Sequence, residues 1–145
     1  MLISELGNSG AIPSLELMVR YSGARQRVIA HNIANLDTPD FRPLDVSPRD
    51  FQVALGKAID ARRQTTGTEG ALNFQGSSQI RMDAQGNMTL TPGTASGNIL
   101  FHDRNNRDLE GLMSQQAENA AVFRTSIELL RTRYGLLQVA ISERV

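Results

Sequence analysis

The sequence predicts a mainly α-helical protein, in which long N- and C-terminal helices pair as a coiled coil and flank an irregular middle segment. Two observations support this fold class. At both ends of the chain, apolar residues recur in alternating steps of three and four, which is the spacing of a coiled-coil seam. Between the ends, residues 64–98 hold six of the twelve glycines and only three charged side chains, so we expect a flexible segment outside the core.

Composition narrows the possible functions. The chain has 145 residues, enough for one modest core, and its 15 Lys and Arg balance its 15 Asp and Glu. It therefore lacks the basic footprint of a nucleic-acid-binding protein. The absence of cysteine excludes disulfides, thiolate metal sites and thiol catalysis. The sequence shows neither a cleavable signal peptide nor an apolar run long enough for a bilayer, which taken alone favours a cytoplasmic protein.

The N-terminal part is predicted to be a flexible tail over residues 1–10 and a helix over residues 11–36. Pro13 suits the first turn of a helix, and Pro39 prevents the helix from continuing far beyond Leu36. Asn35 can take the left-handed conformation that closes a helix. The apolar seam positions predicted to pair within the chain are Leu15, Val19, Ile29, Ile33 and Leu36.

Polar residues also occupy seam positions, namely Ser22 and Gln26 in the first helix and Gln116 in the last. One interpretation is that they weaken the helix pair while fixing its register. The other is that they are solvated positions beside a frayed stretch. The spacing leaves both interpretations open, and it does not decide whether the two helices run parallel or antiparallel.

Residues 37–107 are predicted to form an irregular insert between the two helices. Ser47 to Asp50 resembles a capping box with proline at the first helical position, which predicts a short helix over residues 48–61. Residues 80–83 and 88–91 alternate in polarity around a Gly-containing stretch, which predicts a small β-hairpin.

The last helix is predicted over residues 108–144, with Asp108 as its N-cap. No proline interrupts it, and at 1.5 Å per residue it is roughly 50 Å long, too long to bury its seam over its own core. Its predicted intrachain seam comprises Leu109, Met113, Phe123, Ile127, Leu130, Tyr134, Leu137 and Ile141.

A second apolar repeat on the last helix comprises Val122, Leu129 and Leu136. It lies more than a quarter-turn from the centre of the seam, so a two-helix pair would leave it in water. We therefore predict that it is an intersubunit surface, on which full burial of each side chain is worth about 1.5–3 kcal/mol. A heterologous contact that does not close would give a helical filament. The alternative is that part of the middle segment folds back over this stripe.

Catalytic and ligand-binding motifs are missing from the sequence. His31 and His102 are the only histidines, and neither has a second ligand at metal-binding spacing. Asp103, Asn105 and Asp108 lack the glycine and the bidentate glutamate of an EF-hand loop. The sequence also lacks a serine with a partnered histidine and a phosphate-binding glycine loop. We therefore expect no catalytic, cofactor-binding or metal-binding residues, and no enzyme activity.

The helix end at residues 31–42 resembles the N-terminal signature of the bacterial flagellar rod and hook family, Asn-x-Ala-Asn-x-x-Thr-Pro-Gly followed by Tyr or Phe. The matching residues are Asn32, Ala34, Asn35, Thr38, Pro39 and Phe41. Residues 105–110 also resemble the start of the final helix in the family's proximal-rod member, and the resemblance covers about residues 11–60 and 99–145. Asp40 and Arg104 stand where the family commonly has glycine. Because Asp tolerates a left-handed φ better than most residues, we expect the turn at Asp40 to survive.

The resemblance implies a structural subunit of the proximal rod of the flagellar basal body, which assembles helically through its terminal helices into a torque-transmitting shaft. It implies partners, namely other copies of the chain, adjacent rod proteins, and ring-junction and export-gate proteins at the rod base, but no nucleic acid or small-molecule substrate. It also implies type III export without a cleaved signal into the periplasmic space, against the cytoplasmic expectation. Two alternatives stay open, a cytoplasmic coiled-coil adaptor or chaperone and a paralogous rod protein higher in the shaft.

Overall fold

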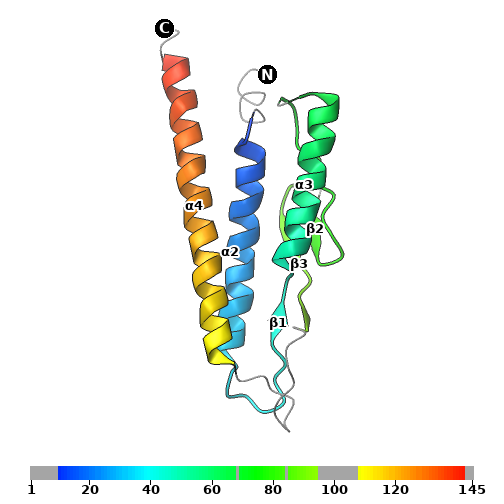
Figure 1. Ribbon diagram of the computed structural model, residues 1–145, viewed down its shortest axis with the longest axis vertical. Helices are drawn as coiled ribbons and strands as arrows, with labels where there is room; N and C mark the ends of the chain where they lie inside the picture. The colour runs from blue at the N-terminus through cyan, green and yellow to red at the C-terminus, as the bar shows by residue number, and fades with distance from the viewer. Residues whose placement is uncertain (1–9, 68, 84, 95–107, 143–145) are drawn as a thin grey trace.

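The computed structural model describes residues 10–67, 69–83, 85–94 and 108–142, and it confirms the mainly helical fold class. Its elements, in chain order, are α2 (Ile12–Ala34), β1 (Leu44–Asp45), α3 (Pro48–Thr65), β2 (Ile80–Met82), β3 (Met88–Leu90), β4 (Gly93–Thr94) and α4 (Leu109–Ser142). In Figure 1, α2 lies between α4 on one side and α3 on the other. β1 pairs with β4 and β2 pairs with β3, both antiparallel.

The helices α2 and α4 run antiparallel. Asn119, early in α4, donates a hydrogen bond to the Ser22 carbonyl, whereas Tyr134, late in α4, reaches Glu16 near the start of α2. With 34 residues α4 is about 51 Å long, and it extends past the amino end of α2 (Figure 1). The last turns of α4 therefore reach beyond the helix on which α4 packs.

The hydrophobic core lies on the side of α2 away from α4. Its buried members come from α2, α3, the chain between them and the hairpin, and they are Leu17, Tyr21, Val46, Phe51, Leu55, Ala58, Phe74 and Ile80. The Tyr21 ring stacks on the Phe51 ring at a centroid distance of 4.0 Å. The Tyr21 hydroxyl donates to the Val46 carbonyl at 2.8 Å, and burial raises the pKa of Tyr21, so the phenol stays neutral.

The middle segment contributes to this core, so the prediction that residues 64–98 lie outside it is wrong. Phe74 is 8% exposed and Ile80 is fully buried. The predicted hairpin is confirmed, with Ile80 opposite Leu90 and Met82 opposite Met88. Burial alternates along both strands. A hairpin with one buried face needs apolar side chains only at alternate positions, so a polar composition is compatible with a place in the core.

The predicted helix starts are confirmed by side-chain caps. The Ser47 hydroxyl accepts from the Asp50 amide at 3.2 Å, with Pro48 next to it at the start of α3. The Asp108 carboxylate accepts from the Gly111 amide at 2.8 Å at the start of α4. Helix α3 is longer than predicted and ends at Thr65.

The end of α2 differs from the prediction. Asn35 has φ −108° and is not left-handed. It closes the helix through its side chain instead, because its Nδ2 donates to the His31 carbonyl at 2.8 Å. The left-handed residue of this turn is Asp40, with φ 58°.

Candidate assembly surface

Asn32 ties the chain that leaves α2 back onto the helix. Its side chain is 2% exposed, its Nδ2 donates to the Leu44 carbonyl at 2.6 Å, and its Oδ1 accepts from the Leu44 amide at 2.9 Å. A carboxamide that pairs with both groups of one residue replaces a neighbouring peptide of a β-ladder. The first asparagine of the signature therefore fixes where β1 begins relative to α2.

The other signature residues shape the turn between Asn32 and Leu44. The Thr38 amide donates to the Asn35 carbonyl, and the Phe41 amide donates to the Thr38 carbonyl. The Phe41 ring meets the His31 ring edge-on at 5.5 Å. Ala34, Thr38 and Pro39 are exposed. The structure thus gathers the signature into one surface turn at the carboxyl end of α2.

Asp40 provides a direct test of this turn. A left-handed φ costs an ordinary residue about 1–2 kcal/mol and costs glycine almost nothing. We expect Asp40→Gly to keep or slightly raise the free energy of unfolding, and Asp40→Val to lower it by about 1–2 kcal/mol. Chemical denaturation of the two variants beside the wild type checks this. Equal stability of the Val and Gly variants would show that the turn does not require a positive φ.

An ion pair of a buried arginine, which was not predicted from the sequence, holds β1 on α2. The Arg25 guanidinium, whose side chain is 7% exposed, donates from Nε and Nη2 to the two Asp45 oxygens, each at 3.1 Å. The Gln79 side chain links the hairpin to the start of α3, because its Oε1 accepts a hydrogen bond from the Ser47 amide at 3.0 Å. No local spacing signals these contacts, because the partners lie 20 and 32 residues apart.

The helix seam uses a different row of α4 residues from the predicted one. The residues of α4 buried against α2 are Leu112, Asn119 and Ser126. Asn119 Nδ2 donates to the Ser22 carbonyl at 2.9 Å and to Gln26 Oε1 at 2.8 Å. The hydroxyls of Ser126 and Ser22 donate hydrogen bonds to backbone carbonyls of their own helices. Polar seam residues with satisfied hydrogen bonds support the interpretation that Ser22 and Gln26 help to fix the register.

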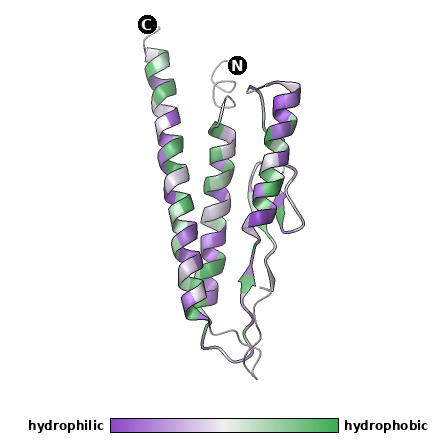
Figure 2. Cartoon of the chain, in the orientation of Figure 1, coloured by the Kyte–Doolittle hydropathy of each residue, from purple (hydrophilic) through white to green (hydrophobic). Residues whose placement is uncertain are grey.

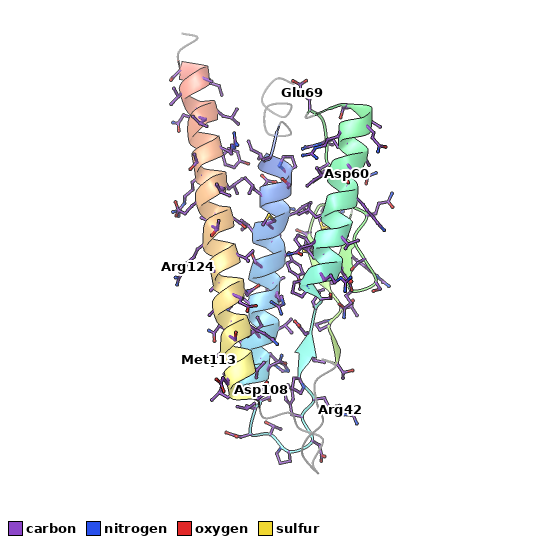
Figure 3. All side chains as sticks on the ribbon, viewed as in Figure 1. Arg42, Asp60, Glu69, Asp108, Met113 and Arg124 are labelled. Carbon is purple, nitrogen blue, oxygen red and sulfur yellow. The ribbon has the colours of Figure 1, made fainter. Side chains whose placement is uncertain are left out.

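Four predicted seam residues of α4 are exposed in the single chain, which corrects the predicted seam: Leu109 (47%), Met113 (52%), Tyr134 (44%) and Ile141 (51%). Figure 3 labels Met113 on α4. The predicted seam residues buried on α2 are Leu15 and Ile29, and the half-buried ones are Val19, Ile33, Leu36, Phe123, Ile127, Leu130 and Leu137. The Tyr134 hydroxyl donates a hydrogen bond to Glu16 Oε1 of α2 at 2.7 Å, which raises the pKa of Tyr134.

Gly23 allows α2 and α4 to pack closely. A β-carbon built on Gly23 would lie 3.5 Å from Phe123 Cε2, which is ordinary van der Waals contact, so the Phe123 ring packs directly over the glycine. The glycine lets α4 present Phe123 and the neighbouring Asn119 to α2. Rotation of α4 toward the predicted row, to which Phe123 itself belongs, would break the Asn119 hydrogen bonds to Ser22 and Gln26.

We expect Gly23→Ala to be tolerated and Gly23→Leu to separate the two helices. The alanine methyl fits, and its better helix propensity adds up to about 1 kcal/mol to the free energy of unfolding. The leucine side chain overlaps Phe123, and overpacking costs about 1–3 kcal/mol. Thermal unfolding of both variants checks this. If the Leu variant were as stable as the Ala variant, α2 and α4 would not pack closely at Gly23.

The predicted intersubunit stripe is exposed. Val122, Leu129 and Leu136 are 46%, 49% and 57% exposed, so none of the described parts of the chain seals them. They lie on one flank of the α4 seam, while Met113 and Tyr134 lie on the other flank. Figure 2 shows apolar positions along the whole of α4, including its end beyond α2. Helix α4 therefore has two exposed apolar flanks.

A small groove adjoins the stripe. It has a volume of about 210 Å³ and is lined by residues of α2, of α4 and of the start of α3. Phe51 and Leu55 of α3 line one side, and Val122 lines the other. The first residue of the stripe thus borders a recess into which an apolar side chain fits.

The described residues bring together no group of three or more side chains of the kinds that bind metal ions. The other candidate residues of the sequence lie outside those residues, namely His102, Asp103, Arg104 and Asn105. Within the same ranges, none of the helices is both long and apolar enough to cross a membrane.

Comparison with known proteins agrees with the signature turn. The chain matches no protein-family model. It is 32% identical to the flagellar basal body rod protein FlgB of Escherichia coli over 111 residues, which cover 73% of this chain and 74% of that protein. It is 25% identical to FlgB of Bacillus subtilis over 135 residues, which cover 92% of this chain and 95% of that protein. The chain therefore belongs to the FlgB family of flagellar basal body rod proteins.

Proposed function

We propose that this chain is a structural subunit of the flagellar basal body rod and that it joins its neighbours through the apolar flanks of α4. The observation that carries the proposal is the exposure of Val122, Leu129 and Leu136 on a helix of a chain whose relatives are rod proteins. These side chains lie at seven-residue intervals on a 34-residue helix. A contact repeated along such a helix gives a stiff, elongated interface.

The energetics fit a subunit that assembles by many small contacts. Each stripe side chain keeps about half of its surface in water, so further burial of each yields about 1 kcal/mol. Three residues therefore contribute about 3 kcal/mol to one contact, which is weak for a dimer. A subunit surrounded by several neighbours makes such contacts several times over, so this surface favours an array over an isolated pair.

The fold has two parts that we propose have different roles in such a subunit, the core and helix α4. The core of α2, α3 and the hairpin is sealed by its own side chains, with Val46 and Ile80 fully buried. Helix α4 packs on α2 and leaves its flanks open. The signature turn, held by Asn32, fixes how the chain passes from α2 to the core. We propose that α2 and α4 transmit load along the rod while the core holds their spacing.

The family resemblance supports the finer parts of the proposal. On this basis we propose that the subunit lies in the proximal part of the rod, in the periplasmic space, after type III export without a cleaved signal. Its neighbours there are other copies of the chain, adjacent rod proteins, and ring-junction and export-gate proteins at the base of the rod. We propose a purely structural role in this assembly, with no catalytic step.

Deletion of the gene from its host tests the function. We expect basal bodies that lack a complete rod, loss of motility, and recovery of both when the full chain is supplied. An antibody to the chain is expected to label the rod of isolated basal bodies. Normal rods in the deletion strain, or a chain that stays in the cytoplasm as a small closed oligomer, would contradict the proposal and favour an adaptor or chaperone.

A further inference from the structure

The face of α2 beside the hairpin turn carries two exposed arginines. Arg20 and Arg27 are seven residues apart, so they lie on the same side of the helix, about 10 Å from each other along its axis. Arg20 is held in place, because its Nη1 donates to the Gly86 carbonyl of the hairpin turn and its Nη2 lies 3.8 Å from a Glu16 oxygen. No described residue forms a hydrogen bond or an ion pair with the guanidinium of Arg27. The charge of Arg27 is therefore available to a group from outside the chain.

Two recesses open on this face, and Arg27 lines both. One has a volume of about 560 Å³ and is lined by Arg20, Arg27 and the hairpin turn at residues 85–88. The other has a volume of about 410 Å³ and extends along α2 to His31 and along residues 88–90 of the hairpin. Both volumes fall in the range of clefts that bind small ligands, about 300–1,000 Å³, so the face can take the tip of a loop.

The signature turn carries the opposite charge. Asp37 and Asp40 are exposed and lie three residues apart, and no described residue pairs with either carboxylate. The turn follows the carboxyl end of the 23-residue α2, which carries about half a negative charge. Arg42, which Figure 3 labels, is exposed two residues after Asp40 and offsets one negative charge. The turn therefore keeps a net charge of about −1.5.

The remaining exposed carboxylates of the described residues are isolated or already have a role in the chain. Those that lie in the first turn of a helix, in an ion pair or in a local hydrogen bond are Asp50, Asp60, Asp83, Asp108, Glu110 and Glu128. Glu69 and Glu118 are single charges. Within the described ranges, the signature turn is thus the place where two exposed and unpaired carboxylates lie close together.

We propose that the signature turn of one copy of the chain binds the Arg27 face of the next copy, with Asp37 and Asp40 directed at Arg27. This inference rests on the proposed function, because it takes the neighbour to be another copy in the rod. Within one chain the two surfaces do not meet, since the turn begins about 10 Å further along α2 than Arg27. The two surfaces differ, so the contact is heterologous, and its repetition gives an open array.

Charge reversal in isolated basal bodies tests the contact. Arg27→Glu reverses the charge of the face. The turn variant combines Asp37→Lys with Asp40→Asn, because asparagine tolerates the left-handed φ at position 40. We expect each change alone to lower the amount of chain in rods at least about tenfold, since it places like charges opposite each other. A chain that carries both changes is expected to recover to within about threefold of the wild type, because opposite charges again face each other.

Arg81→Glu is the matched control for these variants. Arg81 is exposed on β2, on the side of the hairpin away from the buried Ile80, and it lines neither recess. We expect this variant to enter rods at the wild-type level. Wild-type incorporation of Arg27→Glu, or no recovery in the combined variant, would overturn the contact. The proposed function would still stand on the presence of the wild-type chain in rods.

Cross-linking tests the same contact without a change of charge. The chain has no cysteine, so Ala30→Cys, one turn after Arg27, and Thr38→Cys, in the signature turn, each introduce a unique thiol. In rods that contain both single-cysteine chains, a short bismaleimide is expected to give a linked dimer that neither chain gives alone. Absence of this dimer would overturn the contact.

Failure of the proposed function gives a different result. In that case the wild-type chain itself is absent from rods, and the two single-cysteine chains are mixed instead at about 1 mM in solution. We expect the same linked dimer there, and less of it in 1 M salt, because salt screens exposed charges. A mixture that gives no more dimer than either chain alone would overturn the contact.

Discussion

Leu129→Asp is expected to reduce incorporation of the chain into rods at least about 100-fold, while its folding and its export stay at the wild-type level. Leu129 is 49% exposed in the single chain, so the new carboxylate remains hydrated before assembly. In an apolar contact, the variant loses about 1 kcal/mol of leucine burial and must also desolvate a charge, which is the larger cost. A total loss of 2.8 kcal/mol corresponds to a factor of 100 in an equilibrium constant. The measurement compares the chain found in purified basal bodies with the chain exported.

Ala121→Asp is the matched control for this variant. Ala121 is exposed on the same helix, about 100° round the axis from Val122, so the substitution adds the same charge away from the stripe. We expect it to assemble much better than Leu129→Asp. Equal incorporation of the two variants, or normal motility with Leu129→Asp, would count against the stripe as a contact surface.

Ile80→Ala is expected to lower the free energy of unfolding by about 2–5 kcal/mol. Ile80 is fully buried beside Tyr21 and Phe51, and the truncated side chain would leave a cavity between the hairpin and the helices. Val53→Ala, at a position 50% exposed on α3, removes less apolar surface and should change the stability by less than about 0.5 kcal/mol. Chemical denaturation measures both. A loss below 1 kcal/mol for Ile80→Ala would show that the hairpin is not part of the core.

The elements that were predicted correctly are determined by short-range chemistry. Ser47 and Asp108 cap their own helices through amides three residues away. The hairpin follows from alternation and from Asp83, whose carboxylate accepts from the Gln85 and Asn87 amides in the turn. In each of these hydrogen bonds the donor and the acceptor lie within four residues of each other along the chain. A short sequence pattern therefore includes both partners.

The face of α4 that meets α2 could not be obtained in the same way. The predicted seam is the most apolar row of α4, yet Asn119 and Ser126 are buried and Met113 is exposed. The choice depends on partners about 100 residues away, chiefly the Asn119 hydrogen bonds to Ser22 and Gln26 of α2. The seven-residue repeat gives the period of a seam, but not the rotation of the helix about its axis.

Polar contacts between residues far apart in the chain also could not be predicted from the sequence. Arg25 binds Asp45 across the helix–strand junction, and Arg62 reaches Gly10 across 52 positions. In the sequence, both arginines resemble solvated surface residues. The position of Phe74 in the core could not be predicted either, because its glycine-rich surroundings in the sequence indicate a loop.

Thiol accessibility tests most directly whether the flank of α4 is covered by neighbouring molecules. The chain has no cysteine, so Val122→Cys, Leu129→Cys and Leu136→Cys each introduce a unique thiol. Each rate of reaction with a maleimide is compared between the monomer and assembled rods, after normalisation to the unfolded chain. We predict rapid reaction in the monomer and at least about tenfold slower reaction in rods at all three positions, since burial excludes the reagent. Equal rates in the two states would contradict the proposal that these residues form the contact between subunits.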